Sequence, residues 1–227
     1  MNVAEKITYK GQEINICYDE SADSPRVEDN VGTMVCWHRS YNLGDEKPRG
    51  DYEDWLLQMS EQILGETDEA EKLSKQEQLD LIEKNAVILP LWLYDHSGIS
   101  MRTCPHGQHA SWDCGRVGFI YVMHSQIRKE YSVTEITPEL LEKVEKILEG
   151  EVETYSDYLE GNVYGYKTEN DSCWGYFGNS GLKQAIADAK EYIDWEIADK
   201  LKKHLGKLKA QLKNKVPLEK REVYTNG

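Results

Sequence analysis

The alternation of apolar and polar residues predicts a set of short strands. Residues 6–19 alternate on either side of Lys10-Gly11-Gln12, a pattern typical of a β-hairpin. The apolar runs 86–94 and 117–123 predict two buried strands that pair, with an irregular point at Pro90. Further strands are expected at 33–39, 161–167 and 173–177, and loops at 19–31, 42–51 and 98–111.

Helical periodicity marks the remaining segments, which are 51–64, 74–85, 125–130, a helix beginning at Thr137 and a helix over about 181–215. Ser74 and Glu77 match a capping box. The last helix, about 50 Å long at 1.5 Å per residue, either projects, pairs with another helix or wraps the sheet. These elements predict an α+β fold, in which helices pack a mixed or antiparallel sheet and a long helix forms the C-terminal part.

Charge is distributed unevenly along the 227 residues, whose net charge is −14. Residues 1–196 hold 18 Lys and Arg against 38 Asp and Glu, whereas residues 197–227 hold 9 against 3. We therefore expect an acidic α+β domain over 1–196 and a basic helical extension over 197–227. The acidic part argues against nonspecific binding to DNA and permits imitation of nucleic acid, although acidic surfaces also serve solubility.

Composition suggests a protein of the cytoplasm. There is no apolar run of the roughly 20 residues that a membrane span needs, and the N-terminal residues do not resemble a signal peptide. The five cysteines are scattered and odd in number, so we expect free thiols. The 14 Tyr and 6 Trp against 2 Phe suit interfaces and pockets, or strand packing.

Three stretches combine strand-forming residues with groups that are costly to bury, which suggests a shared site or interface: 32–45, 91–98 leading into 112–122, and 171–178. Their polar residues at the ends of predicted strands are His38, Arg39, Asp45, Asp95, His96 and Asp113. Such a set could surround a substrate, with Cys173 nearby, or form a polar network that fixes loops. The aromatic residues expected to bind a partner are Trp37, Tyr41, Trp92, Trp112 and Trp174.

The spacing of Cys and His residues argues against a metal site and an activated nucleophile. Cys104, His106, His109 and Cys114 are zinc-ligand types, but their spacing lacks the C-x2-C knuckle, which favours a polar surface loop without metal. Cys36 and His38 are two residues apart, so they would face the same side of a strand, and Cys173 could meet His96 across a sheet. Either pair could act as nucleophile and base, but buried structural thiols are the favoured interpretation. The chain has no P-loop, no G-x-G-x-x-G and no H-E-x-x-H, and we expect no cofactor.

The three stretches together resemble a widespread family of uncharacterised proteins from phages, plasmids and related mobile elements. The similarity covers about residues 7–195 and is carried by Gly-Thr-Met-Val-Cys-Trp-His-Arg at 32–39, Tyr-Asn-Leu-Gly-Asp at 41–45, and segments 89–99, 112–122, 150–159 and 172–175. The chain departs from the family pattern in loop 101–111 and in the basic tail after 196.

The resemblance implies a mobile-element context and no particular chemistry. Because small acidic proteins of phages often act against host defence, we expect a non-enzymatic inhibitor of a host nucleic-acid-handling defence complex, of the anti-CRISPR or anti-restriction type. The alternatives are an enzyme or ligand-binding protein that uses the polar set, and an oligomer assembled through helix 181–215. The basic end of that helix could also touch nucleic acid or an acidic partner, or form a solvated face.

Overall fold

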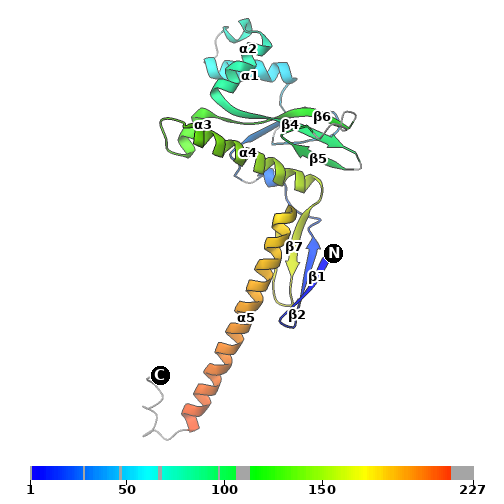
Figure 1. The fold of residues 1–227 in the computed structure, drawn as a ribbon, viewed down its shortest axis with the longest axis vertical. Coiled ribbons are helices and arrows are strands. Elements are labelled where there is room, and N and C mark those ends of the chain that lie inside the picture. The colour runs from blue at the N-terminus through cyan, green and yellow to red at the C-terminus, as the bar shows by residue number, and fades with distance from the viewer. Residues whose placement is uncertain are drawn as a thin grey trace. The chain divides into compact units, whose positions relative to one another are not determined.

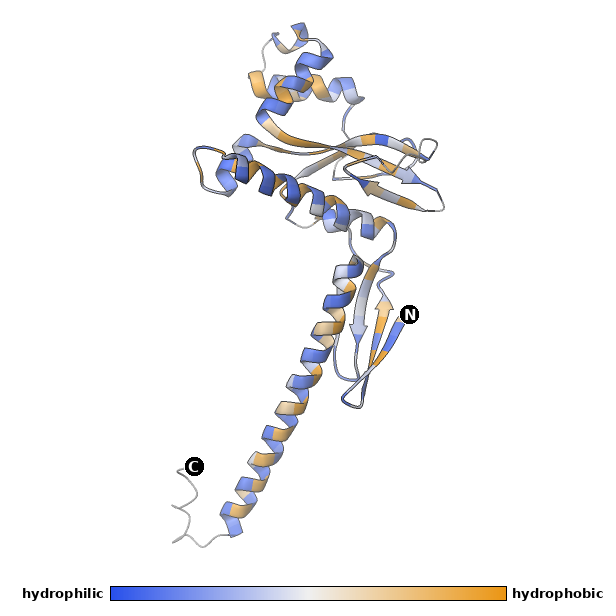
Figure 2. Cartoon of the chain, viewed as in Figure 1, coloured by the Kyte–Doolittle hydropathy of each residue, from blue (hydrophilic) through white to orange (hydrophobic). Residues whose placement is uncertain are grey.

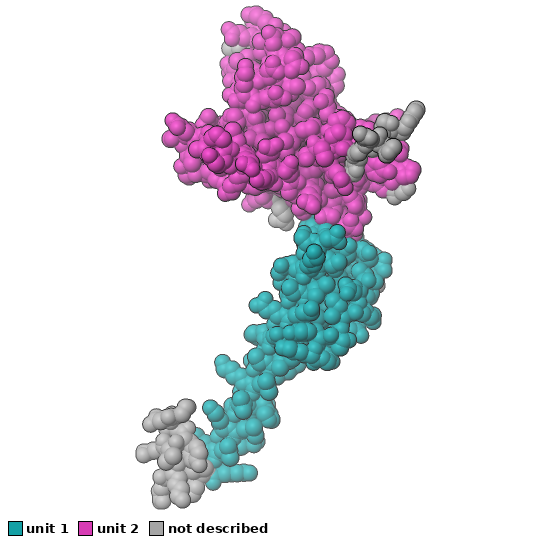
Figure 3. Space-filling view, viewed as in Figure 1, with its two compact units in different colours: residues 1–20, 163–227 teal, residues 21–162 magenta. Residues whose placement is uncertain are grey.

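The protein has an α+β fold, as its sequence predicts. The structure, a computed structural model, describes residues 2–27, 29–45, 48–65, 68–96, 98–105 and 113–215. These residues form five α-helices and two four-stranded antiparallel sheets (Figure 1). Contacts divide the chain into unit 1, residues 1–20 and 163–227, and unit 2, residues 21–162 (Figure 3). The boundary expected from charge, at residue 196, falls inside the last helix and stays a prediction.

Unit 1 contains the first sheet, with strand order β1-β2-β7-β8. Its strands are β1 (Val3–Tyr9), β2 (Gln12–Tyr18), β7 (Val163–Lys167) and β8 (Ser172–Phe177). The predicted hairpin is confirmed, and it turns at Lys10 and Gly11, whose φ angles are +48° and +82°. Two consecutive positive φ angles are those of a type I′ turn, which matches the twist of the paired strands.

Helix α5 (Gly178–Lys215) confirms the long C-terminal helix and begins three residues before the predicted start. Its first half packs Ala185, Ala189 and Ile193 against the sheet, onto Ile14 and Ile16. From Leu201 to Lys215 every residue is exposed. Figure 2 shows apolar residues along this exposed half. No helix in the described ranges has a stretch long and apolar enough to cross a membrane.

Unit 2 contains the second sheet, with strand order β3-β6-β4-β5. Its strands are β3 (Thr33–Cys36), β4 (Ala86–Asp95), β5 (Ile99–Arg102) and β6 (Cys114–Met123). Strands β4 and β6 pair as predicted, and their register shifts between Leu91 and Trp92, next to Pro90. Two expectations were wrong: residues 99–102 form a strand within the predicted loop, and β3 ends at Cys36 instead of continuing to 39.

Three of the four described helices of unit 2, α1, α2 and α4, begin after a residue whose side chain caps them. They are α1 (Tyr52–Leu64), α2 (Lys75–Asn85), α3 (His124–Glu130) and α4 (Pro138–Leu159), with short 3-10 turns at Pro25–Val27 and Ala70–Lys72. The capping box of Ser74 and Glu77 is present, and Asp51 and Thr137 cap α1 and α4. These side chains bind backbone N–H groups that have no partner inside the helix.

The sheet of unit 2 is buried on both faces, because its side chains alternate. Met34 and Ile120 pack against α4 at Val144 and Leu148. Their sequence neighbours point the other way, so that Val35 and Phe119 pack against α1 with Trp55, Leu56 and Met59. Figure 1 shows the sheet between α4 and the pair α1 and α2. The resulting three layers hold the ends of the strands in place.

Candidate functional site

Five polar side chains meet at one end of the sheet of unit 2, and we call them the edge cluster: His38, Tyr41, Asp95, His96 and Asp113. They follow β3, end or follow β4, and precede β6, which the antiparallel pairing brings to the same end. His96 Nδ1 lies 3.3 Å from Asp113 Oδ2, and the backbone N–H of Asp95 donates to the carbonyl of Asp113 at 2.9 Å.

His38 and Tyr41 complete the edge cluster. Nδ1 of His38 accepts the backbone N–H groups of Ser40 and Tyr41 at 3.2 and 3.0 Å, so the neutral ring carries its proton on Nε2. The two rings stack with centroids 4.8 Å apart, and the Tyr41 hydroxyl donates to Asp95 at 3.3 Å. The side chains of His96 and Asp113 are 62% and 44% exposed. The edge cluster is therefore a surface constellation that ties one turn to two strand ends.

The other members of the predicted polar set lie elsewhere. Arg39 is exposed on the turn after β3, and Cys173 is exposed on β8 of unit 1. Cys36 is buried, and burial raises the pKa of its thiol to about 12, with the Asp45 carboxylate adding to the effect. A thiol with this pKa is protonated at neutral pH, and the nucleophile of cysteine chemistry is the thiolate. The described geometry thus gives the edge cluster two carboxylates and two imidazoles but no activated thiol.

The aromatic residues predicted to bind a partner divide between the two units. Tyr41 in unit 2 and Trp174 in unit 1 are each 38% exposed. Trp37 is half-buried and donates its indole N–H to the Gly50 carbonyl at 3.2 Å. Trp92 is half-buried, with an indole nitrogen that is buried and has no hydrogen-bond partner among the described atoms. Trp112 lies outside the described residues.

A buried ionic network, of which the sequence patterns indicated only Asp45, is centred on Arg26, whose side chain is 3% exposed. Its Nε and Nη2 donate to the two Asp45 oxygens at 2.6 and 2.7 Å. Nη1 donates to Glu151 at 2.8 Å and to Asn30 at 3.0 Å, and Nη2 also donates to the Gly32 carbonyl at 2.6 Å. All five guanidinium N–H groups are therefore used.

The carboxylates of this network also hold the chain that leads into β3. Asp45 accepts the N–H of Met34, and Glu151 accepts the N–H of Val31, both at 2.7 Å. Burial acts to lower the pKa of Arg26, but the hydrogen bonds with Asp45 and Glu151 outweigh it and the pKa is raised. Since every donor is satisfied inside the protein, the network fixes the loop, β3 and α4 to one another and leaves no N–H group of Arg26 for a ligand.

The possible zinc ligands fall partly outside the described residues, which exclude His106 and His109. Of the other two, Cys104 is exposed and Cys114 is half-buried. Within the described ranges, no three His, Cys, Asp or Glu side chains are grouped as a metal site requires.

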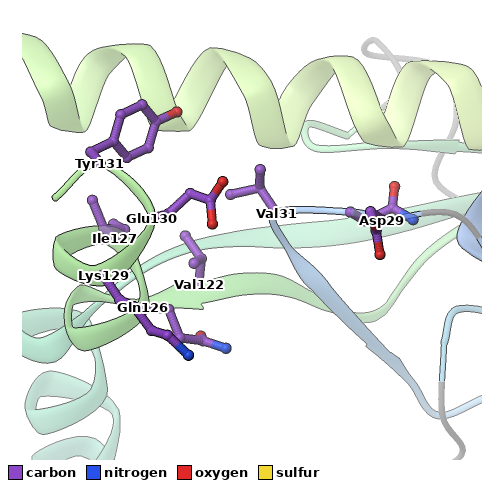
Figure 4. Close-up of a pocket in the computed structure, with 9 residues that line it drawn as sticks. Asp29, Val31, Val122, Gln126, Ile127, Lys129, Glu130 and Tyr131 are labelled. Atoms are coloured by element: carbon purple, nitrogen blue, oxygen red, sulfur yellow. The ribbon is translucent and has the colours of Figure 1, made fainter.

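A cavity of about 390 Å³ opens beside α3 in unit 2 (Figure 4). Its floor includes the buried Val122 and Ile127, and its rim carries Asp29, Lys129 and Glu130. Figure 4 shows the Glu130 side chain extending toward Val31. The lining contains no member of the edge cluster, so the predicted polar set does not define this cavity.

Negative charge is concentrated in unit 2. Its 142 residues carry 28 Asp and Glu against 13 Lys and Arg, a net charge of −15, whereas unit 1 carries 13 against 14. Helix α4 presents a row of exposed carboxylates on the side away from its buried Val144, Leu148 and Val152. The row consists of Glu139, Glu142, Glu145, Glu149 and Glu153. At 1.5 Å per residue, these carboxylates follow one another about every 5 Å along the helix.

Lysine neutralises part of this row. Lys146 lies 2.6 Å from Glu142 and holds the pKa of that carboxyl below its usual range. Glu145, Glu149 and Glu153 form no ion pair in the part of the chain that the structure describes. Glu145 and Glu149 also raise the pKa of Lys146 through their charge, without forming an ion pair with it. The row still carries more carboxylates than lysine charge, and it presents that excess to solvent.

Comparisons of the chain with protein-family models, with curated proteins and with solved structures give no match. The resemblance to the mobile-element family stays a prediction.

Proposed function

We propose that the protein is an acidic binding protein, encoded by a phage or other mobile element, that inhibits a host nucleic-acid-handling defence complex in the cytoplasm. The observation that carries this proposal is the net charge of −15 in unit 2, together with the carboxylate row of α4. The protein would be an inhibitor of the anti-CRISPR or anti-restriction type, because the complexes that such inhibitors block bind nucleic acid in a basic groove.

The physical basis is competition for that groove. A groove that binds nucleic acid gains affinity from contacts between its Lys and Arg and regularly spaced phosphates. Carboxylates on a rigid helix can make the same contacts without the bases. Exposed aromatic rings such as Tyr41 add apolar contact area, which interfaces favour.

The edge cluster supports the alternative, an enzyme or small-ligand-binding protein. Four predicted residues of that set, His38, Asp95, His96 and Asp113, do come together. However, they lie on the surface, and Cys173 belongs to the other unit. We therefore rank this alternative second.

The test is a pull-down from nuclease-treated bacterial lysate that expresses candidate defence complexes, read by mass spectrometry. The proposal predicts one stoichiometric nucleic-acid-binding partner that added DNA or RNA displaces. The triple variant Glu145→Gln/Glu149→Gln/Glu153→Gln should lose that partner.

A matched control removes the same charge from another part of unit 2. Glu69, Glu71 and Glu83, in and near α2, are exposed, and their conversion to Gln should leave the partner bound. Equal loss in both triple variants would mean that only net charge matters, and the α4 row would then not be the contact surface. A blank pull-down would favour the alternative and direct ligand screening to His38 and His96 variants.

A further inference from the structure

The exposed half of α5 carries an apolar row that its own unit does not cover and that plays no part in the proposed function. Leu201, Leu205, Leu208 and Leu212 are 58%, 55%, 40% and 63% exposed. They are separated by four, three and four residues, which is the spacing of the a and d positions of a coiled coil. We call them the leucine row.

The leucine row continues, with a gradual turn around the helix, the apolar series of α5 that packs in the core of unit 1. Ile197 packs against that core, and Leu201 follows it by four residues. At 100° per residue, the row is turned by about a third of a turn from Ala185, Ala189 and Ile193, and every residue from Leu201 on is exposed. An uncovered row of large aliphatic side chains that serves no packing role within its unit marks an interaction surface.

The charges beside the leucine row restrict what can cover it. Residues 200–215 contain seven lysines and no Asp or Glu. Lys202 and Lys209 stand at the e positions, and His204 and Gln211 stand at the g positions that flank the row. Two copies of this segment, paired parallel or antiparallel, would place these groups against each other without an opposite charge, which disfavours self-association.

We infer that the leucine row binds an acidic amphipathic helix of a partner protein. The partner presents aliphatic residues at its own a and d positions and Glu or Asp at the flanking positions, where they meet Lys202 and Lys209. A membrane fits less well, because the row holds no Trp or Phe, the aromatic residues typical of a helix that lies in a membrane interface.

The experiment titrates the full chain into two fluorescent 21-residue peptides and follows anisotropy. Both peptides have Leu at a and d; one has Glu and the other has Lys at e and g. We expect the Glu peptide to bind at least about tenfold more tightly than the Lys peptide at low salt. The double variant Leu205→Ser/Leu208→Ser should lose binding of the Glu peptide.

A charge exchange tests whether Lys202 and Lys209 themselves select the Glu peptide, or whether the positive charge of the whole segment attracts it. Lys202→Glu/Lys209→Glu should transfer the preference to the Lys peptide. The matched variant Lys203→Glu/Lys207→Glu changes charge by the same amount on the opposite side of the helix, and it should keep the preference for the Glu peptide. Far-ultraviolet circular dichroism of each variant checks that α5 stays helical.

Three results would overturn the inference. Equal binding of both peptides, or of neither, removes the acidic helix as the partner. Self-association in sedimentation that the two Leu→Ser changes abolish assigns the row to a second copy. Binding to vesicles of phosphatidylcholine and phosphatidylglycerol, without binding to the Glu peptide, assigns it to a lipid surface.

Discussion

Arg26 and Asp45 are joined at two points, with Nε and Nη2 of the guanidinium 2.6 and 2.7 Å from the two carboxylate oxygens. Asp45→Ala would leave two donors of a guanidinium that is 3% exposed without partners. We expect a loss of about 3–5 kcal/mol in the free energy of unfolding, measured by urea denaturation.

Two variants control this prediction. Glu153→Ala removes an exposed carboxylate from α4 and should change the free energy of unfolding by less than about 0.5 kcal/mol. In Arg26→Met/Asp45→Ala, the guanidinium and its Asp45 partner are removed together, and Glu151 loses Arg26 just as it does in Arg26→Met alone. The loss should therefore be smaller than the sum of the two single losses. Additive losses would show that the two side chains do not act as a pair.

The substitution Gly118→Ala tests how closely the backbones of β3 and β6 approach each other. A Cβ at Gly118 would overlap the carbonyl oxygen of Val35, which is backbone and cannot turn aside. Gly118→Ala should therefore cost about 1–3 kcal/mol of stability. Gly115, on the same strand, has open space at its Cβ, so Gly115→Ala is the control and should unfold at nearly the wild-type urea concentration.

The five thiols should react at different rates with an aromatic disulfide reagent. Cys104 and Cys173 are exposed and should react first, whereas the buried Cys17 and Cys36 should react only after unfolding. The variant Cys104→Ser/Cys173→Ser should lose the fast phase of the absorbance change. A fast phase that persists and maps by mass spectrometry to Cys36 would contradict its burial beneath α4.

Stability of unit 1 should decrease at alkaline pH. Burial, and then the hydrogen bond that Tyr166 donates to Asp171 at 2.6 Å, raise the pKa of Tyr166 above its ordinary value of 10.0. Above pH 10 the unfolded state loses this proton while the folded state keeps it, so the contribution of Tyr166 is complete below pH 10 and is lost as pH rises. Urea midpoints between pH 8 and roughly pH 11 measure the slope.

Tyr166→Phe has no proton to lose and should flatten that slope. Part of the slope should remain, because burial, together with Cys173 and Asp188, also raises the pKa of Tyr176. Tyr131→Phe, in unit 2, is the control and should leave the slope unchanged. If the urea midpoints of Tyr166→Phe and the wild type fall equally with rising pH, a group other than Tyr166 causes the slope.

Local sequence signals identified most of the elements. The Lys10-Gly11 turn, the Ser74–Glu77 capping box and the apolar period of α5 each depend on neighbours within a few residues, and all are confirmed. Strand β5 was missed because its Ser100 and Arg102 resemble a loop. Its backbone is held by pairing with β4 and by the Ser156 hydroxyl of α4, which accepts from Met101 at 2.9 Å.

The candidate site was predictable only in part. Asp95 and Asp113 were expected at strand ends, and pairing of β4 with β6 does bring them together. The Arg26 network was not predictable, because Arg26 and Glu151 are 125 residues apart and each looks like an ordinary surface residue in sequence. The division into two units was equally hidden, since the stretch 171–178 around Cys173 resembles in composition the stretches that fold in unit 2.

Unit 1 is assembled from two segments of the chain, because β2 pairs with β7 across the whole of unit 2. During synthesis, the β1–β2 hairpin leaves the ribosome before unit 2, and β2 cannot pair with β7 until residue 163 and those after it have emerged. Unit 2 is continuous and can complete its own core in that interval. The hairpin is therefore made before unit 2 but reaches its final place only after unit 2 has been made, and the interval in which the edge of β2 stands unpaired is set by the translation time of unit 2.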